Sequence, residues 1–414
     1  MKTRKTLFST AALIAVIAVT MGLCQIKREA PAATGPAAGV ITDRRIYDDG
    51  APPPLPRAGG TFVDPTFGTT IMRVTDEIDG TSCHNYYSYW PTFNLDSTRF
   101  FVACDNVPKL YRMDPNSFQI SGKAPLFEQR VPGGGYLSAE DAIWSGTNAD
   151  VVFGCIDLKL YAYDVAKKTY SLVKDFSYEL PAGYLSQMSK SLDDNVFAFT
   201  RKDKDYKKLG YVVWRRDQNR TVRKMDVANI DEAQVDKSGR YVVVKAEFSK
   251  TADVQVVDLQ TGSVETLTDP GPDFSPGHSD NGRQIIVGHD NWNNQYTVRK
   301  LASPHQFQTV IALANDWSQA NHVSMLADNE AWCVISNFTA ATGTLGPFRN
   351  EIFQASTDGS QRVRRLAHHH SVYRDYWDTP RADVSRDGRF VAFTSNWGST
   401  KRRDVFIIKV PPVM

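Results

Sequence analysis

Histidine and tyrosine side chains gather near residue 84, and their types suit both proton transfer and sugar binding. The segment CHNYYSYW contains His84, Tyr86, Tyr87 and Tyr89 close together. Such a cluster can stack against a sugar ring and can donate or accept a proton. The alternative is that the aromatic rings fill the mouth of a channel, so the segment indicates either a reactive site or a plug.

Two arginines could bind an acid group, because a guanidinium pairs with a carboxylate through parallel hydrogen bonds. We predict this role for Arg201 and Arg381, with salt bridges to Asp203, Asp378 or Asp383 as the structural alternative. The predicted catalytic residues are His84, Tyr87, Arg201, His289 and Arg381.

A further pair of histidines flanks the hairpin sequence GHSDNGRQIIVGH, which places His278 and His289 near each other at its open end. Trp292 follows in DNWNNQ and could provide a stacking wall. The predicted substrate-binding residues are Tyr86, Gln187, Glu232, His278, Trp292 and Tyr376.

A metal site is a separate hypothesis. His322, Cys333 and the run His368–His370 lie in neighbouring repeats, and imidazole with thiolate suits zinc or another divalent metal. We take His322, Cys333 and His369 as the candidate ligands, although no compact spacing such as CxxC is present. In the alternative interpretation Cys333 is a buried core side chain, and no cofactor is required.

The elements that position these residues repeat along the chain. Two apolar runs flank a tight polar turn at Asp387-Gly388, and similar hairpins recur with the first residue after the turn at Phe100, Val151, Val196, Tyr241, Gln284, Ala331 and Phe390. The interval of about 45 residues is the period of a four-stranded propeller blade. We predict third and fourth strands after most copies, for example Lys159–Asp164 with Thr169–Val173 and Glu351–Ser356 with Gln361–Leu366.

The last copy has only three strands before the chain ends, and Thr69–Thr75 has the composition of the missing outer strand. Joining both ends in one blade removes an exposed sheet edge. The prediction is an all-β, seven-bladed β-propeller that is closed by an N-terminal strand in the last blade.

In such a propeller the start of each inner strand and the end of each second strand lie on one face. Of the eight histidines, all except His305 fall in segments that lead to or leave this face. Loops are polar and carry histidine in any case, but this concentration favours a functional face.

The first residues have the layout of a secretory signal. Lys2, Arg4 and Lys5 precede the apolar run from Leu7 to Val19, which is shorter than a membrane span of roughly 20 residues. We predict a signal peptide at 1–24, a flexible linker at 25–56 rich in Ala, Pro and Gly, and the propeller at 57–414. The protein is then periplasmic or extracellular, and it meets a membrane only if Cys24 is lipidated.

Charge and cysteine content add two expectations. The chain has 48 Lys and Arg against 46 Asp and Glu, so nucleic acid is not expected as a partner. Cys83 and Cys104 should meet at paired strand ends, where they can form a disulfide in an oxidising compartment.

The turn SRDGRFVAFTS followed by RDVFIIKV or EIFQASTDGS resembles TolB-like propellers, over roughly Thr61 to Pro411. The last two blades and CHNYYSYW are more specifically similar to secreted propeller polysaccharide lyases, of the oligogalacturonate lyase and ulvan lyase type. This resemblance implies β-elimination at a uronate bond, with the carboxylate neutralised and a His, Tyr or Arg acting as base.

The resemblance also implies a set of manganese ligands, of which this chain has only one. His322 matches a manganese ligand of oligogalacturonate lyases at the start of blade six, but the other ligands would fall within 376–383, which reads YWDTPRAD. That manganese site is therefore absent as such. Where ulvan lyases carry a second histidine, this chain has Asp105-Asn106.

The leading hypothesis is a secreted propeller that binds an acidic polysaccharide or oligosaccharide and cleaves it by β-elimination. The alternative is a non-catalytic, TolB-like periplasmic scaffold that binds an envelope protein. A channel mouth filled by Tyr86–Trp90 would favour the alternative.

Overall fold

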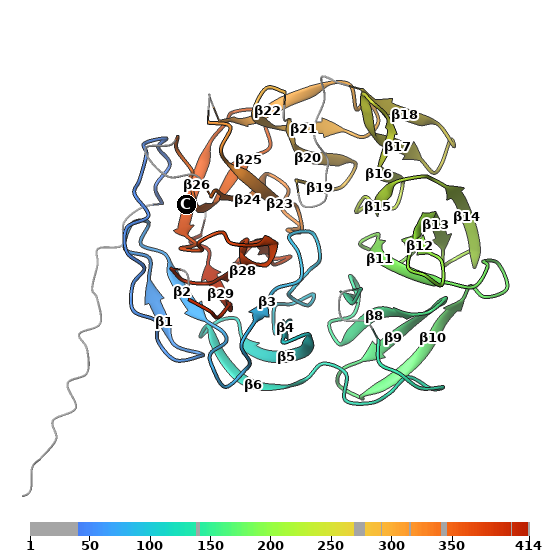
Figure 1. Cartoon of the computed structure of the whole chain (residues 1–414), viewed down its shortest axis with the longest axis horizontal. Helices are drawn as coiled ribbons and strands as arrows, with labels where there is room; N and C mark the ends of the chain where they lie inside the picture. The colour runs from blue at the N-terminus through green and yellow to red at the C-terminus, as the bar shows by residue number, and fades with distance from the viewer. Residues whose placement is uncertain are drawn as a thin grey trace, which may run out of the picture. The chain divides into compact units, whose positions relative to one another are not determined.

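Seven antiparallel β-sheets follow one another around a ring, as the repeat predicts (Figure 1). The computed structural model describes residues 40–137, 141–268, 278–290, 292–313, 316–340, 346–398 and 400–412. Six sheets have four strands and the seventh has five. The predicted fold class, an all-β seven-bladed propeller, is confirmed.

The strands of each blade lie side by side from the middle of the ring to its rim (Figure 1). The inner strands are β3 (Cys83–His84), β7 (Ile143–Trp144), β11 (Tyr184–Lys190), β15 (Ile230–Val235), β19 (Ser279–Asn281), β23 (Ala320–Ser324) and β27 (Asp383–Val384). The second strands are β4 (Arg99–Cys104), β8 (Val151–Ile156), β12 (Val196–Lys202), β16 (Tyr241–Ser249), β20 (Ile285–Asp290), β24 (Trp332–Phe338) and β28 (Phe390–Ser395).

The third strands are β5 (Val107–Asp114), β9 (Lys159–Asp164), β13 (Lys208–Arg215), β17 (Ala252–Asp258), β21 (Gln295–Lys300), β25 (Glu351–Ser356) and β29 (Asp404–Lys409). The outer strands of blades one to six are β6 (Gln119–Pro125), β10 (Thr169–Asp175), β14 (Arg220–Asp226), β18 (Val264–Leu267), β22 (Phe307–Ala312) and β26 (Val363–His368). Two predicted strands, Lys159–Asp164 and Glu351–Ser356, have the predicted bounds.

Both ends of the described chain contribute to blade seven. Strand β2 (Thr70–Arg73) pairs antiparallel with β29, and β1 (Thr61–Val63) pairs with β2 as a fifth strand. The sequence repeat did not predict β1, because a strand of three residues is too short to show an alternation of polar and apolar side chains. The hairpin between β27 and β28 turns at Gly388, whose φ of 71° is the left-handed conformation that glycine adopts without strain.

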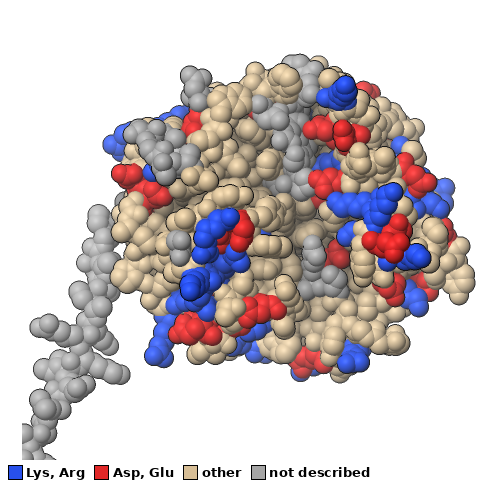
Figure 2. Space-filling view, in the orientation of Figure 1, with Lys and Arg blue, Asp and Glu red and all other residues tan. Residues whose placement is uncertain are grey.

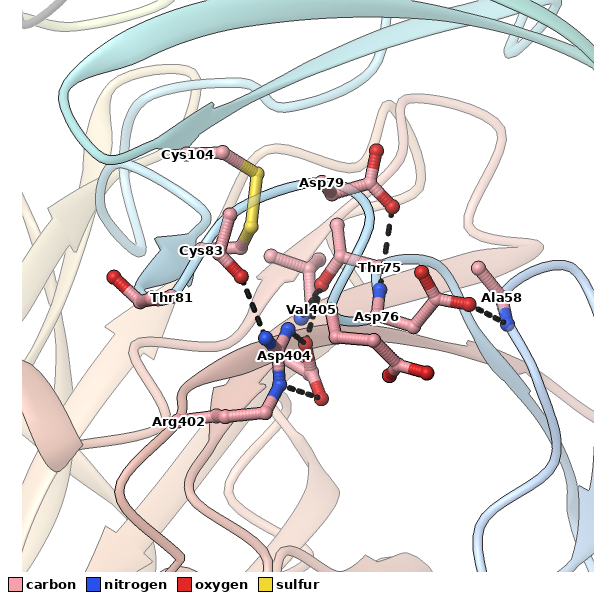
Figure 3. Close-up of polar contacts among 12 residues, drawn as sticks. Ala58, Thr75, Asp76, Asp79, Thr81, Cys83, Cys104, Arg402, Asp404 and Val405 are labelled. Atoms are coloured by element: carbon pink, nitrogen blue, oxygen red, sulfur yellow. Dashed lines mark hydrogen bonds and ion pairs between the residues drawn. A yellow bond between two sulfur atoms is a disulfide. The ribbon is translucent and has the colours of Figure 1, made fainter. Parts of the chain in front are cut away.

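Polar contacts join the two chain ends within blade seven, and a disulfide lies within the neighbouring blade one (Figure 3). Asp404 accepts hydrogen bonds from Arg73 at 2.7 Å and from the hydroxyl of Thr75 at 3.0 Å, so it joins N-terminal residues to β29. Cys83 and Cys104, which are register partners in blade one, form the disulfide that we considered. Cys155 and Cys333 are free and buried.

Residues 40–56 precede the first strand and contact blades six and seven. The backbone amide of Arg365 donates to the carbonyl of Ile41 at 2.9 Å, and the indole of Trp397 donates to the carbonyl of Pro53 at 2.8 Å. The side chain of Asn350 donates to Asp49 at 3.0 Å. The limits of the signal, linker and propeller segments stay predictions, and residues 1–24, with Cys24, and 25–39 lie outside the described part.

The single helical element of the described chain is the 3₁₀ turn η1 (Tyr376–Asp378), between blades six and seven. None of the described helical residues forms a segment that is long and apolar enough to cross a membrane. On the face seen in Figure 2, uncharged side chains occupy much of the middle, and Lys and Arg are interspersed with Asp and Glu toward the edge.

Candidate functional site

The segment after β3 enters the middle of the ring instead of continuing along its blade (Figure 1). The indole of Trp90 donates to the carbonyl of Met188 in blade three at 3.2 Å, and the hydroxyl of Tyr89 donates to Glu232 in blade four at 2.5 Å. Tyr86, Tyr89 and Trp90 are buried in one core cluster with side chains of blades one to three. These three aromatic residues therefore fill the channel.

A cavity of about 1190 Å³ lies against this filled channel. Its walls are mostly aromatic and aliphatic, and they include His84, Tyr86, Tyr87, Tyr89, Trp90, Tyr136, Leu137, Gln187, Tyr376 and Trp377. Glu128 and Asp231 also line it, and each is paired with a lysine, Lys168 and Lys208 respectively. No lysine or arginine appears among the described residues of the wall. The cavity is thus a large aromatic pocket with one histidine.

His84 is the ionisable nitrogen base of this pocket. Its ring centroid lies 5.0 Å from that of Trp377, and Nδ1 lies 3.2 Å from the carbonyl oxygen of Asn85. Burial, together with the charge of Arg381, lowers the pKa of His84 to about 4. The ring is therefore neutral at pH 7. A carbonyl partner at Nδ1 favours the tautomer with its proton there, which leaves Nε2 basic.

Tyr87 and Tyr376 join the two sides of the cavity. Their hydroxyl groups form a short hydrogen bond, and their rings are stacked with centroids 6.3 Å apart. Burial raises the pKa of Tyr87 well above its ordinary value, and the neighbouring Tyr376 adds to this. Both phenols therefore stay protonated, and the pair can donate a proton to a ligand.

Arg381 lies behind the cavity wall and has no exposed surface (0%). Its guanidinium carbon lies 5.0 Å from the ring centroid of Trp377 and 5.7 Å from that of Tyr376. Nη2 donates to the carbonyl of Trp377 at 3.2 Å, while Nε and Nη1 have no hydrogen-bond partner among the described residues.

No carboxylate of the described chain pairs with Arg381. The alternative partners that the sequence offered are engaged elsewhere: Asp378 pairs with Arg374 and Arg403, and Asp383 accepts a hydrogen bond from Thr92. Burial lowers the pKa of Arg381 to about 10, which still leaves it charged at pH 7.

The other predicted arginine has a different environment. Arg201 forms an ion pair with Asp226 and does not line the cavity. Arg201 and Arg381 were predicted to have the same role, but Arg381 alone of the two lies against the cavity wall.

Several other candidates lie apart from the pocket. Glu232 is buried beneath it, bound to Tyr89 and, at 2.7 Å, to Lys245. His289 contacts Asn294 at 3.2 Å, and its ring packs on Tyr296 in blade five. Trp292 is exposed, at 56%. Among the predicted substrate-binding residues, Tyr86, Gln187 and Tyr376 line the cavity, and Oε1 of Gln187 has no hydrogen-bond partner in the described part.

The predicted metal ligands do not come together. His322 is buried with its ring 6.4 Å from that of His278, Cys333 lies in the core of blade six, and His369 uses both ring nitrogens, toward Asn337 and Ser371. Burial raises the pKa of the Cys333 thiol to about 12, which disfavours a thiolate ligand. No group of three or more His, Cys, Asp or Glu side chains in the described structure could hold a metal ion. His322, Cys333 and His369 therefore do not form one cluster in the described structure, and Cys333 packs in the apolar interior of its blade.

Sequence reasoning missed Trp377, which contacts both His84 and Arg381. Its position beside Tyr376 in the sequence YWD was visible, but only η1 turns the two rings toward the first blade.

The class of protein that these observations define is a seven-bladed propeller with an aromatic cavity beside its filled channel. No protein-family model matches the chain, and no curated protein matches it. Among solved structures, the chain is similar to oligogalacturonate lyase from Vibrio parahaemolyticus, with a TM-score of 0.61, 15% identity, and coverage of 85% of this chain and 96% of that chain.

A second similar structure is oligogalacturonate lyase in complex with manganese, with a TM-score of 0.60, 13% identity, and coverage of 87% of this chain and 98% of that chain. TolB from Acinetobacter baumannii also matches, at a TM-score of 0.37 and 15% identity, over 69% of this chain and 64% of that chain. At these identities the lyase structures show a shared fold, and they confirm the predicted resemblance at that level.

Proposed function

We propose that the protein binds an acidic, uronate-containing saccharide in the cavity and cleaves it by β-elimination. The observation that carries this proposal is Arg381, a buried guanidinium with no carboxylate partner in the described chain, behind Tyr376 and Trp377. An unpaired charge in a protein interior is costly. Its retention is typical of a site where the ligand supplies the anion, and a uronate carboxylate is such an anion.

The cavity supplies the remaining contacts. Sugar rings stack on aromatic faces, and Tyr87, Tyr376 and Trp377 present such faces beside the polar atoms of His84 and Gln187. Tyr376 and Trp377 cover the buried Arg381, so both side chains have to move aside before a carboxylate can contact the guanidinium directly. The two covering side chains are themselves 43% and 45% exposed. Both belong to a single turn of three residues, η1, which is a short element to displace.

The proposed reaction uses groups that the cavity already holds. Neutral His84 removes the proton at C5 beside the carboxylate, and that electron pair forms the double bond between C4 and C5. The bond from C4 to the glycosidic oxygen breaks, and the hydroxyl of Tyr87, whose hydrogen bond from Tyr376 is released when η1 moves, donates a proton to the leaving oxygen. The charge of Arg381 stabilises the electron-rich carboxylate that develops.

The similarity to oligogalacturonate lyase supports this choice of reaction, since the folds align over most of both chains. A manganese-bound relative raises the question of a metal, but the residues here do not fit one: 376–383 contains no histidine, and His369 uses both ring nitrogens in hydrogen bonds. No step of the proposal uses a metal.

The test compares variants on polygalacturonate and ulvan, measuring the ultraviolet absorbance of the unsaturated product and, separately, ligand affinity. Arg381→Met should reduce kcat/KM about a hundredfold or more, while the free energy of unfolding stays equal or rises by about 1 kcal/mol, since an unpaired buried charge is removed. Arg201→Met is the matched control and should leave turnover unchanged, because Arg201 is paired with Asp226 away from the cavity. Absence of both binding and product with every uronate polymer would reject the proposal.

A second candidate function is non-catalytic binding, in the manner of an envelope scaffold. The filled channel favours it, because Tyr86, Tyr89 and Trp90 pack as core side chains. Ligand or envelope-protein binding that Arg381→Met weakens, with no unsaturated product from any polymer, would establish this alternative.

A further inference from the structure

Exposed aromatic side chains concentrate on the face that carries the cavity. They lie on two kinds of connection, from an outer strand to the next inner strand and from a second strand to a third strand. Both kinds of connection lie on this face. Those exposed are Tyr136, Tyr178, Tyr206, Trp292, Trp317, Tyr373, Tyr376 and Trp377. In the described chain one exposed aromatic residue, Phe307 at the start of β22, lies at the opposite end.

Ring contacts connect the cavity wall to blade six through the buried side chain of His322. The ring centroid of His322 lies 5.5 Å from that of Tyr87 in the cavity wall and 5.3 Å from that of Phe338, on which it stacks. Phe338 in turn stacks on Tyr373, with centroids 5.9 Å apart and planes 23° apart.

The connection that carries Trp317 is hydrogen-bonded to the segment that follows Phe338. The hydroxyl of Thr339, next to Phe338, donates to the carbonyl of Ser318, next to Trp317, at 2.8 Å. We call Trp317, Phe338 and Tyr373 the aromatic ledge. Two of its members are substantially exposed, Trp317 at 57% and Tyr373 at 41%.

The shape of this surface favours a chain-like ligand. A docking site for a protein has an apolar centre that is packed and contiguous, whereas here the rings form a row that extends from a pocket. Stacking on successive aromatic faces needs flat, repeated units, and the sugar rings of a polysaccharide provide them.

We propose that the aromatic ledge holds the continuation of a polymeric glycan whose uronate unit occupies the cavity, with Trp317 and Tyr373 as stacking subsites. This inference rests on the proposed function and names its substrate class as a polymer instead of a short oligosaccharide. Affinity should therefore increase with chain length until the ledge is filled.

The experiment measures the affinity of the full chain for uronate oligosaccharides of two units and of eight or more units, by calorimetry. Wild type should bind the long chains more tightly. Trp317→Ala and Tyr373→Ala should each weaken binding of long chains about fivefold and leave the two-unit ligand unaffected. Phe307→Ala, an exposed aromatic at the opposite end, is the matched control and should change neither affinity.

The outcomes separate this inference from the proposed function. If wild type binds short and long ligands equally, or if the ledge variants weaken both alike, the ledge is not a subsite although the cavity still binds. If the two variants instead abolish self-association of the protein, the ledge is an interface between copies and the inference is overturned. If wild type binds no uronate ligand of any length, the proposed function fails together with it.

Discussion

The hydroxyl of Tyr89 donates a 2.5 Å hydrogen bond to Oε2 of Glu232, and this bond joins the segment after β3 to blade four. The other carboxylate oxygen of Glu232 lies 2.7 Å from Nζ of Lys245, whose ammonium group also lies 5.4 Å from the ring centroid of Tyr89. All three side chains are buried. The plug of the channel is thus held by a charged pair beneath it.

Substitutions in this group should have unequal effects on stability. Glu232→Gln leaves Lys245 buried without its counter-ion and should lower the free energy of unfolding by about 3–5 kcal/mol. Tyr89→Phe removes one hydrogen bond and keeps the ion pair, so it should cost about 1 kcal/mol. Urea denaturation of both variants measures their free energies of unfolding. Equal losses in the two variants would contradict the conclusion that the Glu232–Lys245 pair contributes most of the stability of this group.

Removing the Cys83–Cys104 disulfide should destabilise the protein. The two residues are 21 positions apart, and a loop of that length corresponds to about 3 kcal/mol of lost unfolded-state entropy. The double variant Cys83→Ala/Cys104→Ala should therefore melt at a lower temperature than wild type. Wild type with a reductant should approach the variant, whereas the variant itself should not respond to reductant.

The pKa of His84 can be measured without knowledge of the substrate. Burial and the charge of Arg381 place it at about 4, so the imidazole NMR signals of His84 should titrate well below the ordinary value of 6.5. The spectrum of His84→Asn identifies the resonance. Arg381→Met removes the neighbouring charge and should move the pKa upward. A midpoint near 6.5 in wild type would mean that His84 is solvated and that the cavity is open around it.

His370 should make stability fall in acid. Burial lowers its pKa to about 4, from 6.5 when unfolded, so the unfolded chain binds a proton there that the folded chain excludes. The stability that neutral His370 contributes is complete above pH 6.5 and is lost as the pH falls toward 4, by about 1.4 kcal/mol per pH unit.

The variant His370→Asn isolates this effect, since asparagine tolerates the φ of 51° at this position. Its free energy of unfolding, relative to wild type, should rise steadily between pH 6.5 and pH 4. A difference that does not depend on pH over this range would show that His370 titrates equally in both states.

The repeat determined the fold because each hairpin is a local pattern. The residues around Asp387-Gly388 and their copies are adjacent in sequence, and sheets that cannot bury both faces alone must stack on copies of themselves. The outer strand of blade seven could be predicted for a related reason: a three-stranded blade leaves an open edge, and Thr69–Thr75, which contains β2, has the composition of a strand. The short strand β1 carried no comparable signal.

The sequence by itself determined the ring of blades and the cluster of His84 with its tyrosines, because both depend on residue type and spacing within a short stretch. It could not determine which arginine is paired. Arg201 pairs with Asp226 across its own blade, whereas Arg381 is enclosed by the rings of Tyr376 and Trp377 and forms no ion pair with a carboxylate of the described residues. Only the tertiary structure decided this, because the environment of a charged side chain depends on groups that folding brings from distant parts of the chain.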